Sequence, residues 1–362
     1  MIHTVVTHVT TMVRCPSKSE RHRGVTTVVR ELDRMPTIAT VAGLAGVSRQ
    51  TVSNVVRAPH RVSPETLARV QAIIREIDYR PNRSARALQA RSTGLLAYRC
   101  HRPEETENLV LDRFLHELCR AADEHDHHIT LVSPVSTDDE LAMYRELFRS
   151  NRVDGFVLSG THIGDRRLPF LVEEGIPFVS FGRNWDAPEA STWVDVDSAH
   201  GTRLATEHYW RGGHRRIAFL GWPDDAAVGA DRRQGYRSAM TGHSLPLIET
   251  TCFDRLDAAE AAAATVLSSG EPPTAVVCAS DTLALGCAWA AQRLGIEVGA
   301  QLGIMGFDDS SATLIARPNL SSIRQPTDQV AHALMDRFIG LRLSSGPTST
   351  LLAPSIVHRG TS

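Results

Sequence analysis

The feature that most constrains the fold is a series of short apolar segments that alternate with stretches of helical spacing from Thr93 onward. The segments read GLLAY, HITLVS, DGFVLSG, PFVSFG, RIAFLG, TAVVCAS and LGIMGFDD. Their apolar residues are continuous and do not alternate with polar ones, so both faces of each strand must be covered. The pattern predicts an α/β body over residues 92 to 362, with doubly wound parallel sheets between layers of helices.

Several of these segments end in glycine, serine or aspartate. The carboxyl ends of parallel strands meet at one edge of a sheet, so these polar side chains should line a crevice between two α/β halves. Ligands of doubly wound proteins bind at this edge. We therefore expect a small-molecule site there.

Residues 37 to 81 have a different pattern, which is typical of a small all-α domain. Gly46 lies where a tight turn would separate two short helices. Ser48 is placed to cap the second helix, and Ser63, followed by Pro64 and Glu65, is placed to cap a third. Two short helices joined by such a turn form a helix-turn-helix. The residues predicted to face the core of this domain are Ile38, Val41, Ala42, Leu44, Ala45, Val52, Val55, Val56, Leu67, Val70, Ile73, Ile74 and Ile77.

The stretch GVSRQTVSNVV, residues 46 to 56, has an unusual outer face. With its valines inward, Arg49, Gln50, Ser53 and Asn54 remain outside near the start of the helix. Arginine and carboxamide side chains make paired hydrogen bonds with guanine and adenine edges. A solvated surface helix would more often carry glutamate and lysine, although helix-turn-helix shapes also occur as plain packing units. The pattern favours a helix that reads base edges in the major groove.

The distribution of charge supports a nucleic-acid-binding head. Residues 37 to 91 hold nine basic and three acidic side chains, whereas residues 92 to 362 hold 24 basic and 35 acidic ones. This asymmetry is typical of a DNA-binding domain joined to a second domain, although a solvated basic face would give the same charges.

A linker should follow the head. Pro81 should end the third helix, and the next segment, RSARALQAR, is poor in large apolar residues. An isolated helix of this length is marginal in water, so residues 82 to 91 should form a hinge that becomes helical only on binding. Residues 1 to 36 should be a disordered tail, and we treat Met35 as an alternative start of translation.

Three blocks in the head and linker, TIATVAGLAGVSRQTVSNVV, VSPET and YRPNRSARAL, resemble the DNA-binding head and hinge of the LacI/GalR family of repressors. Blocks of the body resemble the same family: VDVDSAHGTRLATEHYWRGGHRRIAFLG, DRRQGYRSAM, ASDTLALG, LGIMGFDD and PNLSSIRQP. The resemblance covers nearly all of residues 37 to 360. It implies a helix-turn-helix head, a hinge helix and a two-lobed body similar to a periplasmic sugar-binding protein.

The resemblance implies roles for residues of the head and hinge. Family members read bases with the residues at the positions of Arg49, Gln50 and Asn54, and some of them have arginine in place of Asn54. The leucine at the position of Leu88 enters the central base step of the minor groove, where such a wedge kinks the duplex. The predicted DNA-binding residues are Thr37, Ser48, Arg49, Gln50, Thr51, Ser53, Asn54, Arg57, Asn82, Arg83, Ala85 and Leu88.

The resemblance also implies an effector site in the body. It places Arg232 and Asp308 on effector hydroxyls, where an arginine fork and a carboxylate offer paired donors and paired acceptors. Ser280, which stands where many relatives have asparagine, is included in the predicted site.

Three further candidates for the effector site follow from position alone. Arg183 ends the PFVSFG segment, and Trp185 and Trp222 lie just beyond predicted strands, where an aromatic face can stack on a sugar ring. The alternatives are core or rim packing for the tryptophans and a surface ion pair for the arginine.

Other classes of function lack support in the sequence. There is no G-x-S-x-G elbow and no G-x-G-x-x-G fingerprint, and the six cysteines lack CxxC spacing. We therefore expect no enzymatic activity, no cofactor, no metal site and buried, reduced thiols. No apolar run approaches the ~18 residues that a membrane span requires.

These observations predict a cytoplasmic, nucleoid-associated transcriptional repressor. It should bind a pseudo-palindromic operator in double-stranded DNA as a homodimer or higher oligomer and respond to a monosaccharide or oligosaccharide. Three alternatives stay open: a purine or phosphorylated effector, activation in place of repression, and a solute-binding protein without a DNA role. The sequence does not distinguish an inducer from a corepressor.

Overall fold

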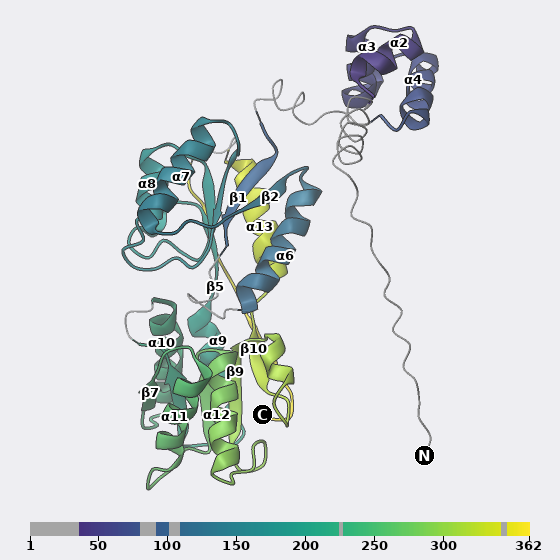
Figure 1. The fold of residues 1–362 in the computed structure, drawn as a ribbon. Coiled ribbons are helices and arrows are strands. Elements are labelled where there is room, and N and C mark those ends of the chain that lie inside the picture. The colour runs from purple at the N-terminus through teal and green to yellow at the C-terminus, as the bar shows by residue number, and fades with distance from the viewer. Residues whose placement is uncertain (1–35, 80–91, 101–108, 224–226, 342–345) are drawn as a thin grey trace, which may run out of the picture. The chain divides into compact units, whose positions relative to one another are not determined.

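The computed structural model describes residues 36–79, 92–100, 109–223, 227–341 and 346–362. The chain divides into two compact units, a head within residues 1–91 and a body within residues 92–362. Both are drawn in Figure 1. Residues 1–35 of the predicted tail and the whole predicted hinge, residues 82 to 91, lie outside the described residues.

Over residues 36–79 the head consists of three α-helices and a short 3-10 turn. Ser48 and Ser63 cap their helices as predicted, since each hydroxyl accepts from the backbone amide three residues later, at 3.0 and 3.4 Å. Gly46 has a φ of 61°, a left-handed conformation that ends the first helix and favours glycine. The elements are α2 (Ile38–Ala45), α3 (Arg49–Arg57), the turn Pro59–Arg61 and α4 (Pro64–Glu76).

The core of the head contains the predicted apolar faces with two exceptions. Val41, Val52 and Val70 are fully buried at its centre. Leu44 and Val56, which were predicted to face inward, are 60% and 38% exposed, so that prediction was wrong for them. Both lie at the edge of the buried stripe of their helix, and a core of three short helices is too narrow to cover a wide stripe.

The third helix ends earlier than its proline suggested. It stops at Glu76, and Asp78 has a left-handed φ of 45°. This turn lets the ring of Tyr79 fold back into the core, where it is 7% exposed. The prediction that Pro81 ends this helix was therefore wrong, because tertiary packing of the tyrosine ends it first.

The body contains two six-stranded sheets, one in each lobe, and they share one topology. The first has the order β11-β5-β4-β3-β1-β2 and the second the order β12-β10-β9-β8-β6-β7. The predicted parallel sheets are confirmed except at one edge, where β10 and β12 pair antiparallel. The first sheet comprises β1 (Leu95–Arg99), β2 (His128–Val132), β3 (Gly155–Leu158), β4 (Phe178–Phe181), β5 (Trp193–Val196) and β11 (Ser349–Leu352). The second comprises β6 (Ile217–Gly221), β7 (Ile248–Thr251), β8 (Ala275–Cys278), β9 (Gly303–Asp308), β10 (Ser321–Arg324) and β12 (Ser355–Val357).

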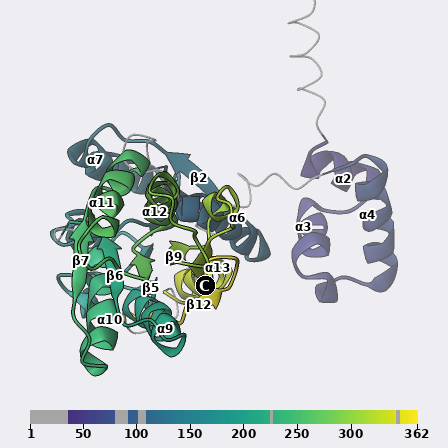
Figure 2. The same cartoon turned by 90° about the horizontal axis from the view of Figure 1, so that it is seen from below.

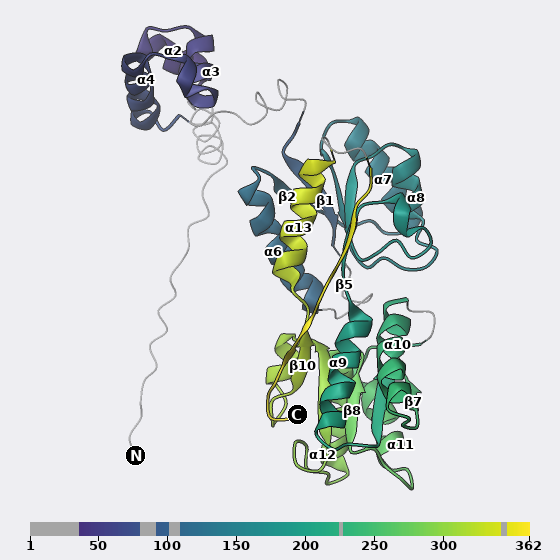
Figure 3. The same ribbon diagram turned by 180° about the vertical axis from the view of Figure 1, so that it is seen from behind.

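Helices cover both faces of each sheet, as the continuous apolar strands required. In the first lobe α6 (Leu109–Glu124) and α13 (Thr327–Gly340) pack together on one face, and α7 (Thr137–Arg149) and α8 (Arg167–Glu173) lie on the other (Figures 1 and 3). In the second lobe α9 (Ser198–Arg211) and α10 (Ala227–Gly242) pack together on one face of the sheet. The helices α11 (Leu256–Leu267) and α12 (Asp281–Arg293) pack together on the other face (Figure 2). Short 3-10 turns lie at Pro188–Ala190 and Ser311–Leu314.

The chain passes between the lobes after β5, after β10 and after β11. In each sheet the strand order reverses beside the first strand, between β1 and β3 and between β6 and β8. Such reversal points leave a crevice at the carboxyl ends of the strands. The topology therefore places the loops after β4, β6, β8 and β9 at the edge where a ligand site was predicted.

The five described cysteines are free thiols. Cys278 and Cys287 are buried as predicted, but Cys119 is exposed on α6, so the prediction of buried thiols was wrong there. Within the described part of the chain no helix is long and apolar enough to cross a membrane.

The contact between α9 and α10 depends on Gly235. A β-carbon there would collide with the backbone carbonyl of Ala199 and the hydroxyl of Thr202. We expect Gly235→Ala to destabilise the body by about 3 kcal/mol, because the two helices must move apart. Thermal unfolding followed by circular dichroism would measure it. Gly242→Ala on the same helix, where a β-carbon meets nothing within 4 Å, is the control and should not lower the melting temperature.

Candidate functional site

The outer face of α3 presents the polar side chains predicted to read bases. Arg49 and Gln50 are exposed in its first turn, and Ser53 and Asn54 are partly buried. The Gln50 side-chain amide donates to Oδ1 of Asn54 at 3.2 Å. This bond holds the two carboxamides on one face of the helix, beside the arginine.

Three hydroxyls of the predicted DNA-binding set are engaged in helix caps. Thr37 forms a reciprocal capping box with Thr40 at the start of α2. Ser48 caps α3, and its Oγ lies 2.9 Å from the hydroxyl of Thr51. Arg57 lies in the last turn of α3. The remaining predicted residues, Asn82, Arg83, Ala85 and Leu88, lie outside the described residues.

In the body, Arg232 connects three elements at the carboxyl edge of the second sheet. Its guanidinium donates to the carbonyl of Ala279 after β8 and, at 3.3 Å, to Oδ1 of Asp308 at the end of β9. The same group lies 5.0 Å from the ring centre of Trp222 and 3.7 Å from that of Phe307. Three of the six predicted effector residues, Arg232, Asp308 and Trp222, therefore meet at one point.

Asp308 is held in an unusual backbone conformation, with a φ of 107°. Its Oδ1 also accepts a 2.6 Å bond from Gln325, at the crossover after β10. Burial raises the pKa of Asp308 to about 6, although the Arg232 guanidinium acts in the opposite direction. Burial and the charge of Asp308 raise the pKa of Asp281 to about 8. Two carboxyl groups whose pKa values are raised, mainly by burial, thus lie at this edge of the sheet.

Ser280 has a structural role at the same edge. Its hydroxyl donates to Oδ1 of Asp254 at 2.5 Å and accepts from the amide of Leu283, so it caps α12. The side chain is 2% exposed. Its hydrogen-bonding groups are thus already occupied by protein.

Arg183 bridges the two lobes. Its Nε donates to Asp195 of β5 at 2.9 Å, and its Nη2 donates to Asp231 of α10 at 3.2 Å. The guanidinium lies 4.5 Å from the ring centre of Trp185. The alternative that Arg183 forms an ion pair is therefore confirmed, but it is not a surface pair. The arginine side chain is only 18% exposed, and its pair with Asp231 joins the two lobes.

Three buried donors in these residues have no hydrogen-bond partner among the described residues. They are the indole N–H groups of Trp185 and Trp222 and the Nε–H of Arg232. A buried donor without a partner costs about 1–3 kcal/mol.

The sequence reasoning missed the partners of these residues. Asp195, Asp231 and Gln325 were not among the candidates, although Asp231 directly precedes Arg232 in the DRRQGY block. It also missed Arg113 of α6, which donates to the carbonyl of Asp309 at 2.6 Å and so joins the lobes a second time. Pairing across lobes leaves no local pattern, because the partners lie 48 and 196 residues apart.

Comparison with protein families gives two matches. Residues 37–82 match the bacterial regulatory proteins of the lacI family, and residues 206–362 match the periplasmic binding protein-like domain. The HTH-type transcriptional regulator CelR of Thermobifida fusca is 33% identical over 324 residues, covering 86% of this chain and 94% of that protein. The HTH-type transcriptional regulator AglR of Rhizobium meliloti is 32% identical over 275 residues, covering 74% of this chain and 76% of that protein.

Solved structures agree with these matches. The complex of the transcriptional regulator CelR with cellobiose is similar with a TM-score of 0.68 and 28% identity, over 90% of this chain and 100% of that one. The Lac repressor dimer bound to operator and the anti-inducer ONPF has a TM-score of 0.74 and 25% identity, over 91% and 99%.

The raised pKa of Asp308 predicts a pH-dependent stability. Its folded pKa of about 6 lies above the usual aspartate pKa of 3.8, so the folded body favours the neutral carboxyl and loses stability as pH rises through this window. Asp308→Asn removes the charge at every pH. We therefore expect its melting temperature, relative to the natural protein, to increase from about pH 4 to about pH 7. The exposed Asp112→Asn serves as a control, and a pH-independent difference for Asp308→Asn would contradict the assignment.

Proposed function

The chain belongs to the LacI family of bacterial regulatory proteins, and from this premise we propose that a sugar-like effector in its cleft controls operator binding by its head. It is a sequence-specific DNA-binding transcriptional regulator and not an enzyme. The observation that carries the proposal is the meeting of Arg232, Asp308 and Trp222 at the carboxyl edge of a sheet, in the same chain as a helix-turn-helix head.

We propose that Arg49, Gln50 and Asn54 contact base edges and that the hinge, with Leu88, enters the minor groove. The exposed first turn of α3 supports the first part, since recognition helices contact bases through their N-terminal residues. The Ser48 cap, whose hydroxyl is bonded to both the amide and the hydroxyl of Thr51, orients this turn. A pseudo-palindromic operator follows from two heads in a dimer.

A monosaccharide or oligosaccharide is the effector that the cleft supports best. The Asp308 carboxylate accepts from sugar hydroxyls, and the three unpartnered donors bind sugar oxygens. Trp185 and Trp222 are partly buried aromatic side chains near these groups, and aromatic rings of this kind stack on sugar rings. The cellobiose complex of a related regulator gives the same class of ligand.

The effector acts by favouring one arrangement of the two lobes. It changes operator affinity only by the difference in its own affinity for the two arrangements. The inter-lobe bonds of Arg183 and Arg113 are the contacts that such a rearrangement would alter. A regulator of this kind works in the cytoplasm, at the nucleoid.

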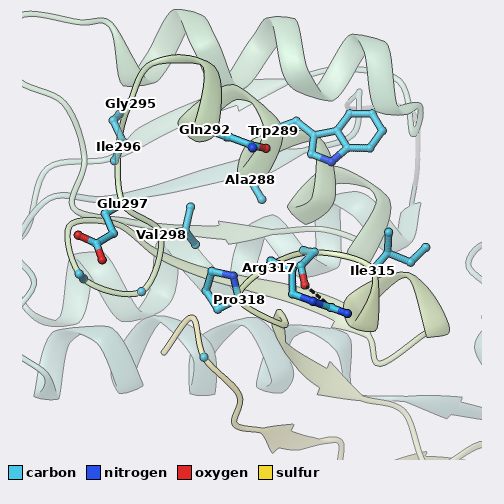
Figure 4. A pocket seen from close by; sticks show the side chains of 14 residues that line it. Ala288, Trp289, Gln292, Gly295, Ile296, Glu297, Val298, Ile315, Arg317 and Pro318 are labelled. Atoms are coloured by element: carbon cyan, nitrogen blue, oxygen red, sulfur yellow. Dashed lines mark hydrogen bonds between the residues drawn. The ribbon is translucent and has the colours of Figure 1, made fainter.

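We propose that an exposed apolar face of the second lobe forms part of a homodimer interface. Trp289 of α12 and Ile315 are 40% and 66% exposed and line an open groove of about 780 Å³ (Figure 4). Leu314 beside them is 52% exposed. An apolar patch of this kind on a regulator that needs two heads is best explained by a second copy of the chain.

DNase footprinting on the DNA upstream of the protein's own gene, with and without a panel of mono- and oligosaccharides, tests the function. We expect a protected two-fold site whose occupancy one sugar changes. Arg49→Ala should weaken binding to this site by about 1–3 kcal/mol, because a bidentate base contact is lost.

Arg69→Ala is the matched control for the DNA prediction. It removes the same charge from an exposed position on α4 and should weaken specific and non-specific binding alike. Equal effects of the two variants on specificity would contradict base reading by Arg49. A protected site that no sugar affects would contradict the effector role.

The dimer interface has its own test. Trp289→Asp places a charge in the apolar patch and should convert the dimer to a monomer in sedimentation velocity, with weaker operator binding. Leu247→Asp, at a residue 48% exposed outside the groove lining, should leave the dimer intact. A dimer that survives Trp289→Asp would exclude this face from the interface.

A further inference from the structure

We propose that the cleft selects an uncharged polyhydroxyl effector and rejects phosphorylated or carboxylated ones, and that Asp231 determines this selectivity. The inference rests on the proposed effector role of the cleft and narrows its ligand class. The observation behind it is that the arginines of the predicted effector site already form ion pairs with aspartates of the protein.

The guanidinium groups of the two arginines in the predicted effector site are paired with carboxylates. Arg183 is bound by Asp195 and Asp231, and Arg232 is bound by Asp308. In the first lobe, just beyond β3, Arg167 contacts Asp165 at 2.6 Å. An anionic ligand would have to displace one of these carboxylates before it could bind an arginine.

Two helix N-termini near these residues are already capped by side chains. Asp197 caps α9, and the amide of Ala199 in its first turn donates to Oδ2 of Asp231 at 3.3 Å. At α12 the Ser280 hydroxyl is the cap and accepts from the amide of Leu283. Free helix N-termini are the usual binding sites for phosphate, and here side-chain oxygens already occupy both.

The groups left for a ligand suit a neutral molecule. The unpartnered donors of Trp185, Trp222 and Arg232 are single N–H groups, and the guanidinium groups that lie against the two indole rings, those of Arg183 and Arg232, each pair with a carboxylate. The pKa of Asp195, like that of Asp308, is raised because both are buried, which indicates that added negative charge is unfavourable here. A phosphate group would meet both repulsion and a desolvation cost, whereas a hydroxyl would meet neither.

Asp231 has a particular place in this arrangement because one oxygen serves two anion-binding groups. Its Oδ2 accepts from Arg183 of the first lobe and from the Ala199 amide of the second. Neutralising this carboxylate would release a guanidinium and a helix-terminal amide together. Asparagine has nearly the same shape, so Asp231→Asn changes the charge with little change in packing.

Isothermal titration calorimetry on the full-length protein tests the inference, with inorganic phosphate, glucose 6-phosphate, glucose and cellobiose as probes. The natural protein should give no heat with inorganic phosphate and should bind glucose 6-phosphate more weakly than the uncharged sugars. Asp231→Asn should give measurable heat with inorganic phosphate and should bind glucose 6-phosphate about tenfold more tightly than the natural protein, since a like-charge contact is removed. A change in tryptophan fluorescence on addition of each probe gives a second measure of binding, because Trp185 and Trp222 lie in the predicted site.

Asp257→Asn is the matched control, because Asp257 is an exposed aspartate that also pairs with an arginine. It should leave all four affinities unchanged. If Asp231→Asn does not fold, judged by circular dichroism, Asp195→Asn provides the same test through Arg183.

Two results would overturn the inference. They are tighter binding of glucose 6-phosphate than of glucose by the natural protein, and no gain of phosphate binding in a folded Asp231→Asn or Asp195→Asn. Footprinting separates this failure from that of the proposed function. A regulator released from its operator by a phosphorylated sugar keeps its function and loses only the proposed selectivity, whereas a protein without a protected DNA site loses the function itself.

Discussion

The contacts of the buried Arg232 guanidinium are the interaction on which the carboxyl edge of the second sheet depends. The arginine is 4% exposed, it joins α10 to the ends of β8 and β9, and it lies against the rings of Trp222 and Phe307. A buried charge is costly unless it is paired and hydrogen-bonded. Asp308 and the Ala279 carbonyl supply these partners, and the Nε–H is the one donor of this group that has no partner among the described residues.

The contacts between the lobes are attached to the same residues. Asp231, which accepts from Arg183, directly precedes Arg232, and Asp309, whose carbonyl accepts from Arg113, directly follows Asp308. The Asp309 carboxylate is fixed in turn by Arg324 at 2.7 Å and Arg359 at 2.5 Å. A ligand that moves Arg232 or Asp308 therefore also moves a residue that holds the lobes together. This adjacency gives a physical route from the cleft to the arrangement of the lobes.

Much of the fold could be predicted because it depends on local patterns. The strands from Leu95, Ile217 and Gly303 were expected from continuous apolar runs, and the starts of α3 and α4 from Ser48 and Ser63. The strands β5, β7, β10, β11 and β12 were not expected, because their four or fewer residues include polar ones, as in WVDV, IETT and SSIR, and so carry no continuous apolar signal. Leu44 and Val56 were assigned to the wrong face for a related reason, since the width of a buried stripe depends on what packs against it.

The sequence by itself determined the architecture. It also determined which polar residues lie on the outer face of α3 and which lie at the carboxyl edge of the second sheet. The spacing around Arg49, Gln50 and Asn54 and the positions of Arg232 and Asp308 after recognisable blocks were sufficient for that. Only the tertiary structure decided how these groups are paired. In the structure Ser280 caps α12, and Arg183 joins the two lobes by donating to Asp231. Local sequence could not predict the bond between Arg183 and Asp231, because hydrogen bonds between distant segments depend on how the lobes fold.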